Sequence, residues 1–132
     1  MSTEVTADAV VSFAGGIPGF ESCQQFVIMS GTGVEPFAIV RGLGPGAPSF
    51  AAIDPLNVVG GYRADLTASD LERLRADDDT SLLWLALISV DASGAATVNL
   101  RAPLVINPAT LRGIQLIATD STYSSVHPLR AA

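Results

Sequence analysis

The chain has few residues that commonly act as nucleophiles, general bases or metal ligands, and their spacing in the sequence does not predict a reactive centre. His127 is the only histidine and Cys23 the only cysteine, whereas a zinc site needs several such ligands at short spacing. Cys23 has no histidine or basic residue near it in sequence to stabilise a thiolate. No G-x-S-x-G elbow supplies a serine nucleophile. We therefore predict no catalytic residues, no metal site and no cofactor.

Two loops deserve comparison with ligand sites. Asp77–Asp79 could form a cation site or an acidic docking patch, or simply a solvated loop. Calcium loops need oxygen ligands that are spaced along the chain, and three consecutive aspartates do not supply them, so the solvated loop is favoured. The segment G-L-G-P-G-A-P (Gly42–Pro48) is rich in glycine, but its prolines block the helix that a phosphate loop requires. It predicts a hairpin loop.

Single polar side chains inside apolar segments are better candidates for a binding surface. Asn99 opens the segment N-L-R-A-P-L-V-I-N and faces away from the core if its apolar neighbours face inward. Gln115 stands in the same relation to its own neighbours, while Tyr123 and His127 lie in a polar tail. Each amide could pair across strands or contact the backbone of a partner, and both interpretations stay open. We name Asn99, Gln115, Tyr123 and His127 as candidate partner-binding residues.

Length and charge restrict the class of protein. A chain of 132 residues with 48% hydrophobic content fits one domain, 1–132, with a real core. It has no lysine and a net charge of −6, which disfavours direct binding to nucleic acid. The apolar run Leu82–Val90 is too short to span a bilayer. The N-terminus lacks the basic start of a signal peptide, so we expect a cytoplasmic protein without membrane contact.

Proline and glycine divide the chain into short apolar segments, a spacing typical of a barrel or sandwich. We predict one helix, Thr67–Ala76, with Thr67 as N-cap and Asp70 in the capping-box position. Phe20–Gln25 is expected to form one helical turn, Gly61–Leu66 an edge strand, and Trp84 a core residue. The other predicted strands are Val10–Phe13, Phe26–Ser30, Pro36–Arg41, Ser49–Asp54, Thr80–Val90, Ala96–Leu100, Pro103–Ile106 and Gly113–Thr119.

These elements predict an all-β, β-dominated fold with minor α content. The expected architecture is a single-domain, bent antiparallel sheet that closes toward a barrel, with the one short helix near Thr67–Ala76. Leu82–Val90 is expected to be buried on both faces, and D-A-S-G after it should turn the chain into a hairpin with Ala96–Leu100.

Several segments together resemble the FliW family of bacterial flagellar assembly factors. They are F-A-G-G-I-P-G-F-E, P-F-A-I-V, L-T-A-S-D-L-E-R-L, N-L-R-A-P-L-V-I-N and Q-L-I-A-T-D-S-T-Y-S-S-V-H-P-L, in family order over most of the chain. The resemblance implies a small, barrel-like, non-enzymatic protein that binds cytoplasmic flagellin. It also implies partner switching with the translational repressor CsrA, where the genome encodes it, and we expect a monomer. The alternative is a small-ligand-binding β-barrel module unrelated to flagella.

Overall fold

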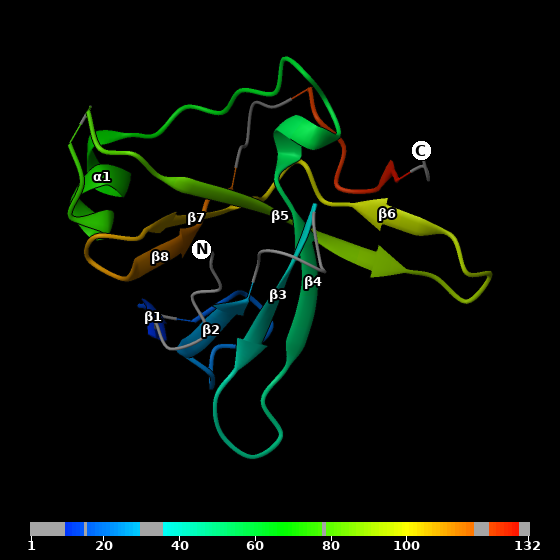
Figure 1. Cartoon of the computed structure of the whole chain (residues 1–132), viewed down its shortest axis with the longest axis horizontal. Helices are drawn as coiled ribbons and strands as arrows, with labels where there is room; N and C mark the ends of the chain where they lie inside the picture. The colour runs from blue at the N-terminus through cyan, green and yellow to red at the C-terminus, as the bar shows by residue number, and fades with distance from the viewer. Residues whose placement is uncertain (1–9, 15, 30–35, 78, 118–121, 130–132) are drawn as a thin grey trace.

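The computed structural model describes residues 10–14, 16–29, 36–77, 79–117 and 122–129 (Figure 1). Among them lie the helix α1 (Ala68–Leu74) and the short 3₁₀ helix η1 (Pro55–Asn57). The strands are β1 (Val10–Phe13), β2 (Gln25–Met29), β3 (Phe37–Gly42), β4 (Ser49–Ile53), β5 (Leu83–Val90), β6 (Ala96–Val98), β7 (Leu104–Asn107), β8 (Arg112–Gln115) and β9 (His127–Pro128). The predicted β-dominated fold class is confirmed.

Seven strands close into a barrel. The sheet runs β4-β3-β2-β1-β8-β7-β5, and a further pairing of β5 with β4 joins its two ends. All neighbours in this ring are antiparallel except β1 and β8, which are parallel. The predicted antiparallel, barrel-like sheet is therefore a mixed barrel, with one parallel pairing at this seam. The reason is topological, because strand directions cannot alternate all the way around a ring with an odd number of members.

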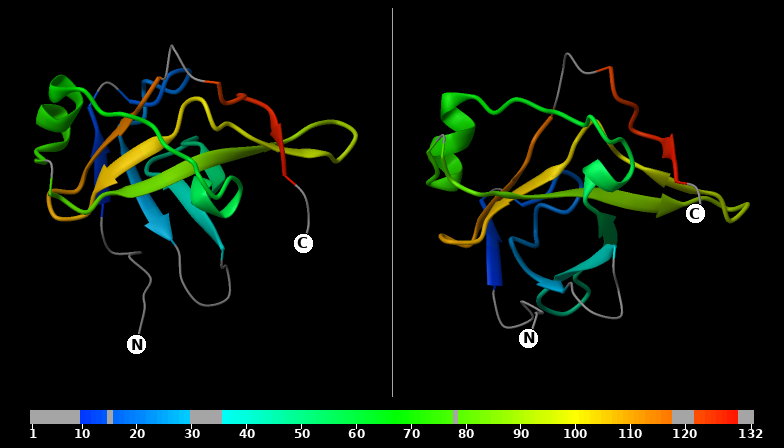
Figure 2. Two further views of the ribbon diagram at one scale, coloured as in Figure 1. Left: turned by 90° about the horizontal axis from the view of Figure 1, so that it is seen from above. Right: turned by 45° about the horizontal axis from the view of Figure 1, so that its top comes forward.

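The strand β5 belongs to two parts of the molecule. Its first half pairs with β7 through Leu83–Leu85, and its last residues, Ile88–Val90, pair with β6. β6 in turn pairs with β9, so β5, β6 and β9 form a three-stranded wing that projects beyond the barrel (Figures 1 and 2). Both views show β5 crossing the molecule from the side of α1 to the tip of the β5–β6 hairpin.

The barrel interior is packed by the inward-facing half of each strand. Phe13 and Phe26 lie at its centre in an edge-to-face contact, with ring centroids 5.5 Å apart. Gly113 sits opposite Phe13 in the parallel seam. A Cβ on Gly113 would lie 2.6 Å from the Phe13 ring, so this position requires the residue without a side chain.

Two smaller apolar clusters cover parts of the outer barrel surface. Under α1, Leu74 packs with Val105, Ile114 and Leu116. Under η1 and the C-terminal residues 122–129, the buried members are Ile53, Ala86, Val98 and Leu100. The outer surface of the barrel is thus covered on one side by α1 and on another by η1 and residues 122–129.

Several local predictions are confirmed. The Gly42–Pro48 segment joins the antiparallel strands β3 and β4 as a hairpin loop. Asp91 begins the predicted D-A-S-G turn, where its carboxylate accepts hydrogen bonds from Ser93 and Ala95. The Ser93 hydroxyl contributes most to lowering the Asp91 pKa. The predicted strand ends at Ser30 and Thr119 lie outside the described residues.

Two predicted elements are wrong. Phe20–Gln25 is not a helix: the Cys23 N–H donates to the Phe20 carbonyl at 3.0 Å in a single turn, and Gln25 already begins β2. A tight turn at Pro18 and Gly19 comes directly before it, in which the Phe20 N–H donates to the Ile17 carbonyl at 2.7 Å. Gly19 has φ of +90°, as the third position of a type II turn requires. Gly61–Leu66 is not a strand, because it crosses the outer surface as irregular chain whose Tyr62 is anchored on the Leu100 carbonyl.

Burial along β5 also differs from the prediction. Leu85 and Ala86 are buried, whereas Ser89 and Val90 are exposed where the strand leaves the barrel. Trp84, which we expected in the core, is only half-buried. Its side chain faces outward, beside a pocket described below, since β4 stops short of this part of β5.

Candidate functional site

Asn99 and Gln115 converge on one peptide unit. The Asn99 Oδ1 accepts hydrogen bonds from the N–H groups of Arg101 and Ala102, both at 3.1 Å. The Gln115 Nε2 donates to the Ala102 carbonyl at 2.9 Å. Both amides are half-buried. Each therefore holds the turn between β6 and β7, which is the intramolecular role that sequence left open.

Tyr123 joins the C-terminal residues to the chain that precedes α1. Its ring lies against that of Tyr62 with centroids 4.5 Å apart, and its hydroxyl accepts from the Arg63 N–H at 3.1 Å. Tyr62 in turn donates its hydroxyl proton to the Leu100 carbonyl at 2.7 Å. Burial, with a smaller contribution from Tyr123, raises the pKa of Tyr62 to about 12.

His127 lies in β9, opposite Val98 of β6. Its ring is half-buried, and Nδ1 lies 2.9 Å from the Pro128 carbonyl oxygen. In the described part of the chain, no group of three His, Cys, Asp or Glu residues could hold a metal ion. His127 therefore lies in β9, the outermost strand of the wing.

The four candidate residues surround one short segment, residues 98–102. Asn99 belongs to it, Gln115 and His127 pair with it, and Tyr123 reaches it through Tyr62. The structure therefore brings the four together. The hydrogen bonds of these four residues are largely made within the chain, so their role in partner binding stays a prediction.

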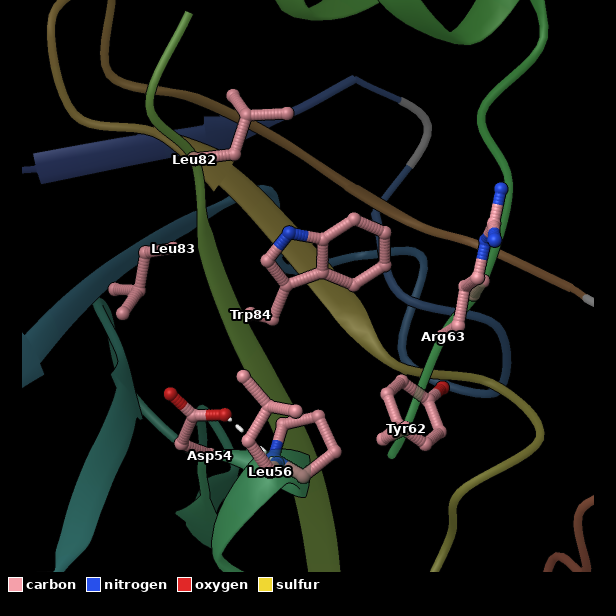
Figure 3. A pocket seen from close by; sticks show the side chains of 9 residues that line it. Asp54, Leu56, Tyr62, Arg63, Leu82, Leu83 and Trp84 are labelled. Carbon is pink, nitrogen blue, oxygen red and sulfur yellow. Dashed lines mark hydrogen bonds between the residues drawn. The ribbon is translucent and has the colours of Figure 1, made fainter. Parts of the chain in front are cut away.

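A pocket of about 330 Å³ adjoins this assembly (Figure 3). Tyr62 and Arg63 form one wall, and Trp84 projects from β5 toward them. Leu56 of η1 forms the opposite rim and is 55% exposed. The remaining lining residues are Asp54, Pro55, Ala64, Leu82 and Leu83.

Sequence reasoning missed this pocket. Trp84 lies in the continuous apolar run of β5, and such a run predicts burial without showing where a neighbouring strand ends. Pro55 was the available signal, because proline cannot donate to a ladder and so ends the β4 pairing beside Trp84.

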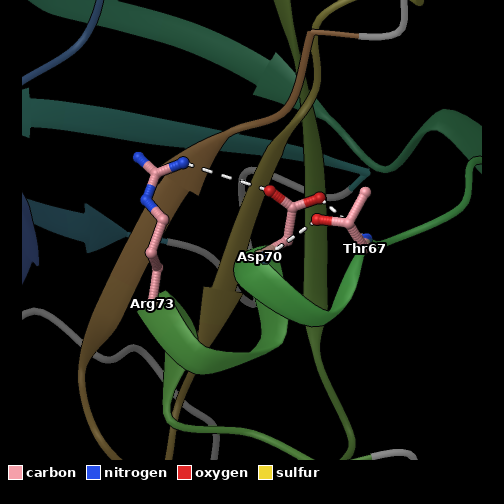
Figure 4. A network of polar contacts seen from close by, with 3 residues as sticks. All are labelled: Thr67, Asp70 and Arg73. Carbon is pink, nitrogen blue, oxygen red and sulfur yellow. Dashed lines mark hydrogen bonds and ion pairs between the residues drawn. The ribbon is translucent and has the colours of Figure 1, made fainter.

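The acidic residues near α1 are engaged locally. Asp70 and Thr67 form the predicted capping box, with reciprocal bonds of 2.9 and 3.1 Å, and Arg73 lies 4.0 Å from Asp70 (Figure 4). After the helix, the Asp77 Oδ1 accepts from the Asp79 N–H and the Thr80 hydroxyl. These bonds fit the solvated loop favoured above, and Asp78 lies outside the described residues.

Cys23 is buried beneath the β3–β4 hairpin loop. Its Sγ contacts the carbonyl oxygens of Gln25 and Leu43. A Cβ on Gly42 would lie 2.8 Å from this sulfur, so the thiol fills space in the barrel end. Within the described residues, no helix has the length and apolar character needed to span a membrane.

Comparison with known proteins agrees with this architecture. A family model described as FliW protein matches residues 1–129. The flagellar assembly factor FliW of Natranaerobius thermophilus is 30% identical over 128 residues, covering 96% of this chain and 85% of the relative. That of Geobacillus thermodenitrificans is 33% identical over 127 residues, covering 96% and 88%.

A solved structure is similar over nearly the whole fold. A crystal structure of the flagellar assembly factor FliW matches with a TM-score of 0.82 and 31% identity, covering 96% of this chain and 89% of that one. The motifs, the mixed barrel and these matches lead to one conclusion: the chain belongs to the FliW family of flagellar assembly factors.

Proposed function

We propose that this protein binds flagellin in the cytoplasm and antagonises the translational repressor CsrA by partner switching. The observation that carries the proposal is the family match over residues 1–129. In this scheme flagellin and CsrA compete for one protein, so that export of flagellin frees it to sequester CsrA. The action is stoichiometric binding by a monomer, without chemistry on either partner.

The charge of the chain supports the second half of the proposal. With a net charge of −6 and only seven basic residues, the surface favours a basic partner over a nucleic acid. An RNA-binding repressor presents such a basic surface. Complementary charge speeds association and makes it sensitive to salt.

We further propose that Asn99, Gln115, Tyr123 and His127 border the partner surface. The hydrogen bonds of Asn99 and Gln115 shape residues 98–102, and the Tyr123 ring packs on Tyr62 beside the pocket. Their contribution is then mainly to position the surface. The alternative of a small-ligand module unrelated to flagella loses its support, because the chain belongs to the FliW family and its barrel interior is filled by apolar side chains.

Isothermal titration tests the proposal directly. The protein is titrated with flagellin of the same organism, then with CsrA if the genome encodes it, and finally with flagellin after CsrA is bound. Saturable one-to-one binding to each partner, with loss of the flagellin signal in the third titration, is the expected result. Binding to flagellin alone would contradict the switch, and no binding to either partner would overturn the whole proposal.

A further inference from the structure

One stretch of the β5 edge is unpaired beside the pocket. In the β4–β5 ladder Ile53 stands opposite Ala86, so the same register would place Pro55 opposite Trp84. Proline has no N–H to donate, and Pro55 begins η1 instead of continuing β4. In the described part of the chain, no other strand takes this position.

The backbone of Trp84 faces this open edge. In a strand, the N–H and C=O groups of alternate residues point to the same side. The Leu87 carbonyl accepts from the Asn99 N–H on the β6 side, so Leu85 and Leu83 also face β7. Trp84 faces the opposite side with Ala86 and Ile88, whose partners lie in β4. Trp84 therefore offers a donor and an acceptor to an added strand.

The side chains around this edge can receive an apolar group. Trp84, Leu82 and the exposed Leu56 surround a volume of about 330 Å³, within the ~300–1,000 Å³ typical of ligand pockets. Figure 3 shows Trp84 pointing into the space between Leu56 and the Tyr62–Arg63 segment. A main-chain edge with an adjoining side-chain pocket is the arrangement by which domains bind extended peptides.

The charges nearby favour a cationic segment. Asp54 is a lining residue, and its carboxylate accepts from the Leu56 N–H at 2.9 Å as the N-cap of η1. Arg63, the cation of the lining, lies 3.7 Å from Asp65, and both side chains are highly exposed. These two charges offset each other, which leaves Asp54 and the net charge of −6 to set the local preference.

We propose that the β5 edge at Leu83–Leu85 and the adjoining pocket bind an extended, cationic segment of a partner protein. The segment adds as a strand along Trp84 and inserts one bulky apolar side chain between Leu56 and Trp84. This inference rests on the proposed function, and among the two partners the charges select the basic repressor CsrA.

Hydrogen exchange of the Trp84 amide tests the added strand. In the free protein this amide faces an open edge, so it should exchange much faster than that of Ile88, which lies in the β4 ladder. Saturation with CsrA should slow the Trp84 amide and leave the Ile88 amide unchanged. Trp84 is the single tryptophan, so its emission should also shift to shorter wavelength as the pocket loses water.

A pair of lysine variants tests the pocket. Leu56→Lys places a cation on the rim, where it repels a cationic segment and blocks the apolar insertion. Val90→Lys makes the same change at a residue that is 66% exposed on the distant end of β5. We expect Leu56→Lys to weaken CsrA binding about tenfold or more, whereas Val90→Lys should bind as the parent chain does. Leu56 is itself 55% exposed, so both variants should fold.

The outcomes separate this inference from the proposed function. If CsrA binds and Leu56→Lys binds equally well, or if the Trp84 amide stays unprotected, the inference is overturned while the proposed function stands. Protection by flagellin and not by CsrA would refute the choice of partner. A shift of Trp84 emission on raising the protein concentration alone would assign the edge to a second copy of this chain and would overturn the inference. Absence of binding to either partner would overturn both.

Discussion

At the scale of single residues, Tyr62 connects the most features of the candidate site. It lines the pocket, packs on Tyr123 and donates to the Leu100 carbonyl. Sequence placed Tyr62 in an edge strand, where its side chain would have had no special role. The sequence could not show that Tyr62 contacts Tyr123 and Leu100, because these residues lie 61 and 38 positions further along the chain.

The raised pKa of Tyr62 predicts a dependence of stability on pH. Its phenol ordinarily titrates near 10.0, and burial raises the pKa to about 12 in the folded chain. The folded state therefore holds the proton more tightly, and the resulting stability is present below about pH 10 and lost as the pH rises toward about 12. Melting temperatures of the parent chain should fall across this interval more steeply than those of Tyr62→Phe.

The variant provides its own control. Tyr62→Phe loses the bond to Leu100 and should be less stable at neutral pH, but it removes the titrating hydroxyl. Equal slopes for the two proteins would show that other groups cause the loss at alkaline pH.

At the scale of elements, α1 depends on a residue of the barrel. A helix of seven residues is marginal alone. Asn107, which is 1% exposed, donates from Nδ2 to the carbonyls of Leu74 and Arg75 at the helix C-terminus, at 3.0 and 3.2 Å. Thr110 donates to Leu74 as well. These bonds satisfy helix-end carbonyls that would otherwise be buried without partners.

Asn107→Ala should therefore destabilise the protein. Removing the amide takes the Asn107 donor away from the Arg75 carbonyl and leaves Thr110 as the side-chain donor to the Leu74 carbonyl, which costs about 1–3 kcal/mol. Urea unfolding measures this loss. If α1 detaches first, the far-ultraviolet helix signal should fall at urea concentrations below the main unfolding transition. Asn57→Ala, at an exposed position of η1, is the matched control and should stay within about 0.5 kcal/mol of the parent chain. A loss of the same size in both variants would remove Asn107 from this role.

Elements with strong local signals were predictable from sequence. The capping box of Thr67 and Asp70 located α1, and alternating apolar residues located most of the strands. The failures, at Phe20–Gln25 and Gly61–Leu66, fall where a turn or a distant contact decides the conformation. The intramolecular bonds of Asn99 and Gln115 were left open for the same reason, since their partner, Ala102, is defined only by the fold.

At the scale of the whole molecule, barrel closure depends on the parallel seam between β1 and β8. Gly113→Ala should destabilise the fold by about 1–3 kcal/mol, because the added methyl group overlaps the buried Phe13 ring, only 2.6 Å away. Gly60→Ala is the control, since nothing lies within 4 Å of a Cβ at that position. Denaturant unfolding of both variants measures the difference. Similar stabilities would mean that Phe13 repacks easily and that the seam tolerates a side chain.

Membership of the FliW family bears on whether the chain is an enzyme. The relatives are assembly factors rather than enzymes, which confirms the expectation of a non-enzymatic protein. The open edge at Trp84 was beyond sequence analysis, because it depends on where β4 ends relative to β5.

The sharing of β5 between barrel and wing has a consequence for how the molecule opens. β6 pairs only with the far end of β5, and β9 pairs with β6, whereas the ring closes through the first half and the centre of β5. We therefore expect the wing to open without breaking the ring, and its amides to exchange as a separate unit with a lower opening free energy than the barrel. Partial proteolysis in native buffer should then cut at the β5–β6 hairpin while leaving a protected core of the barrel strands.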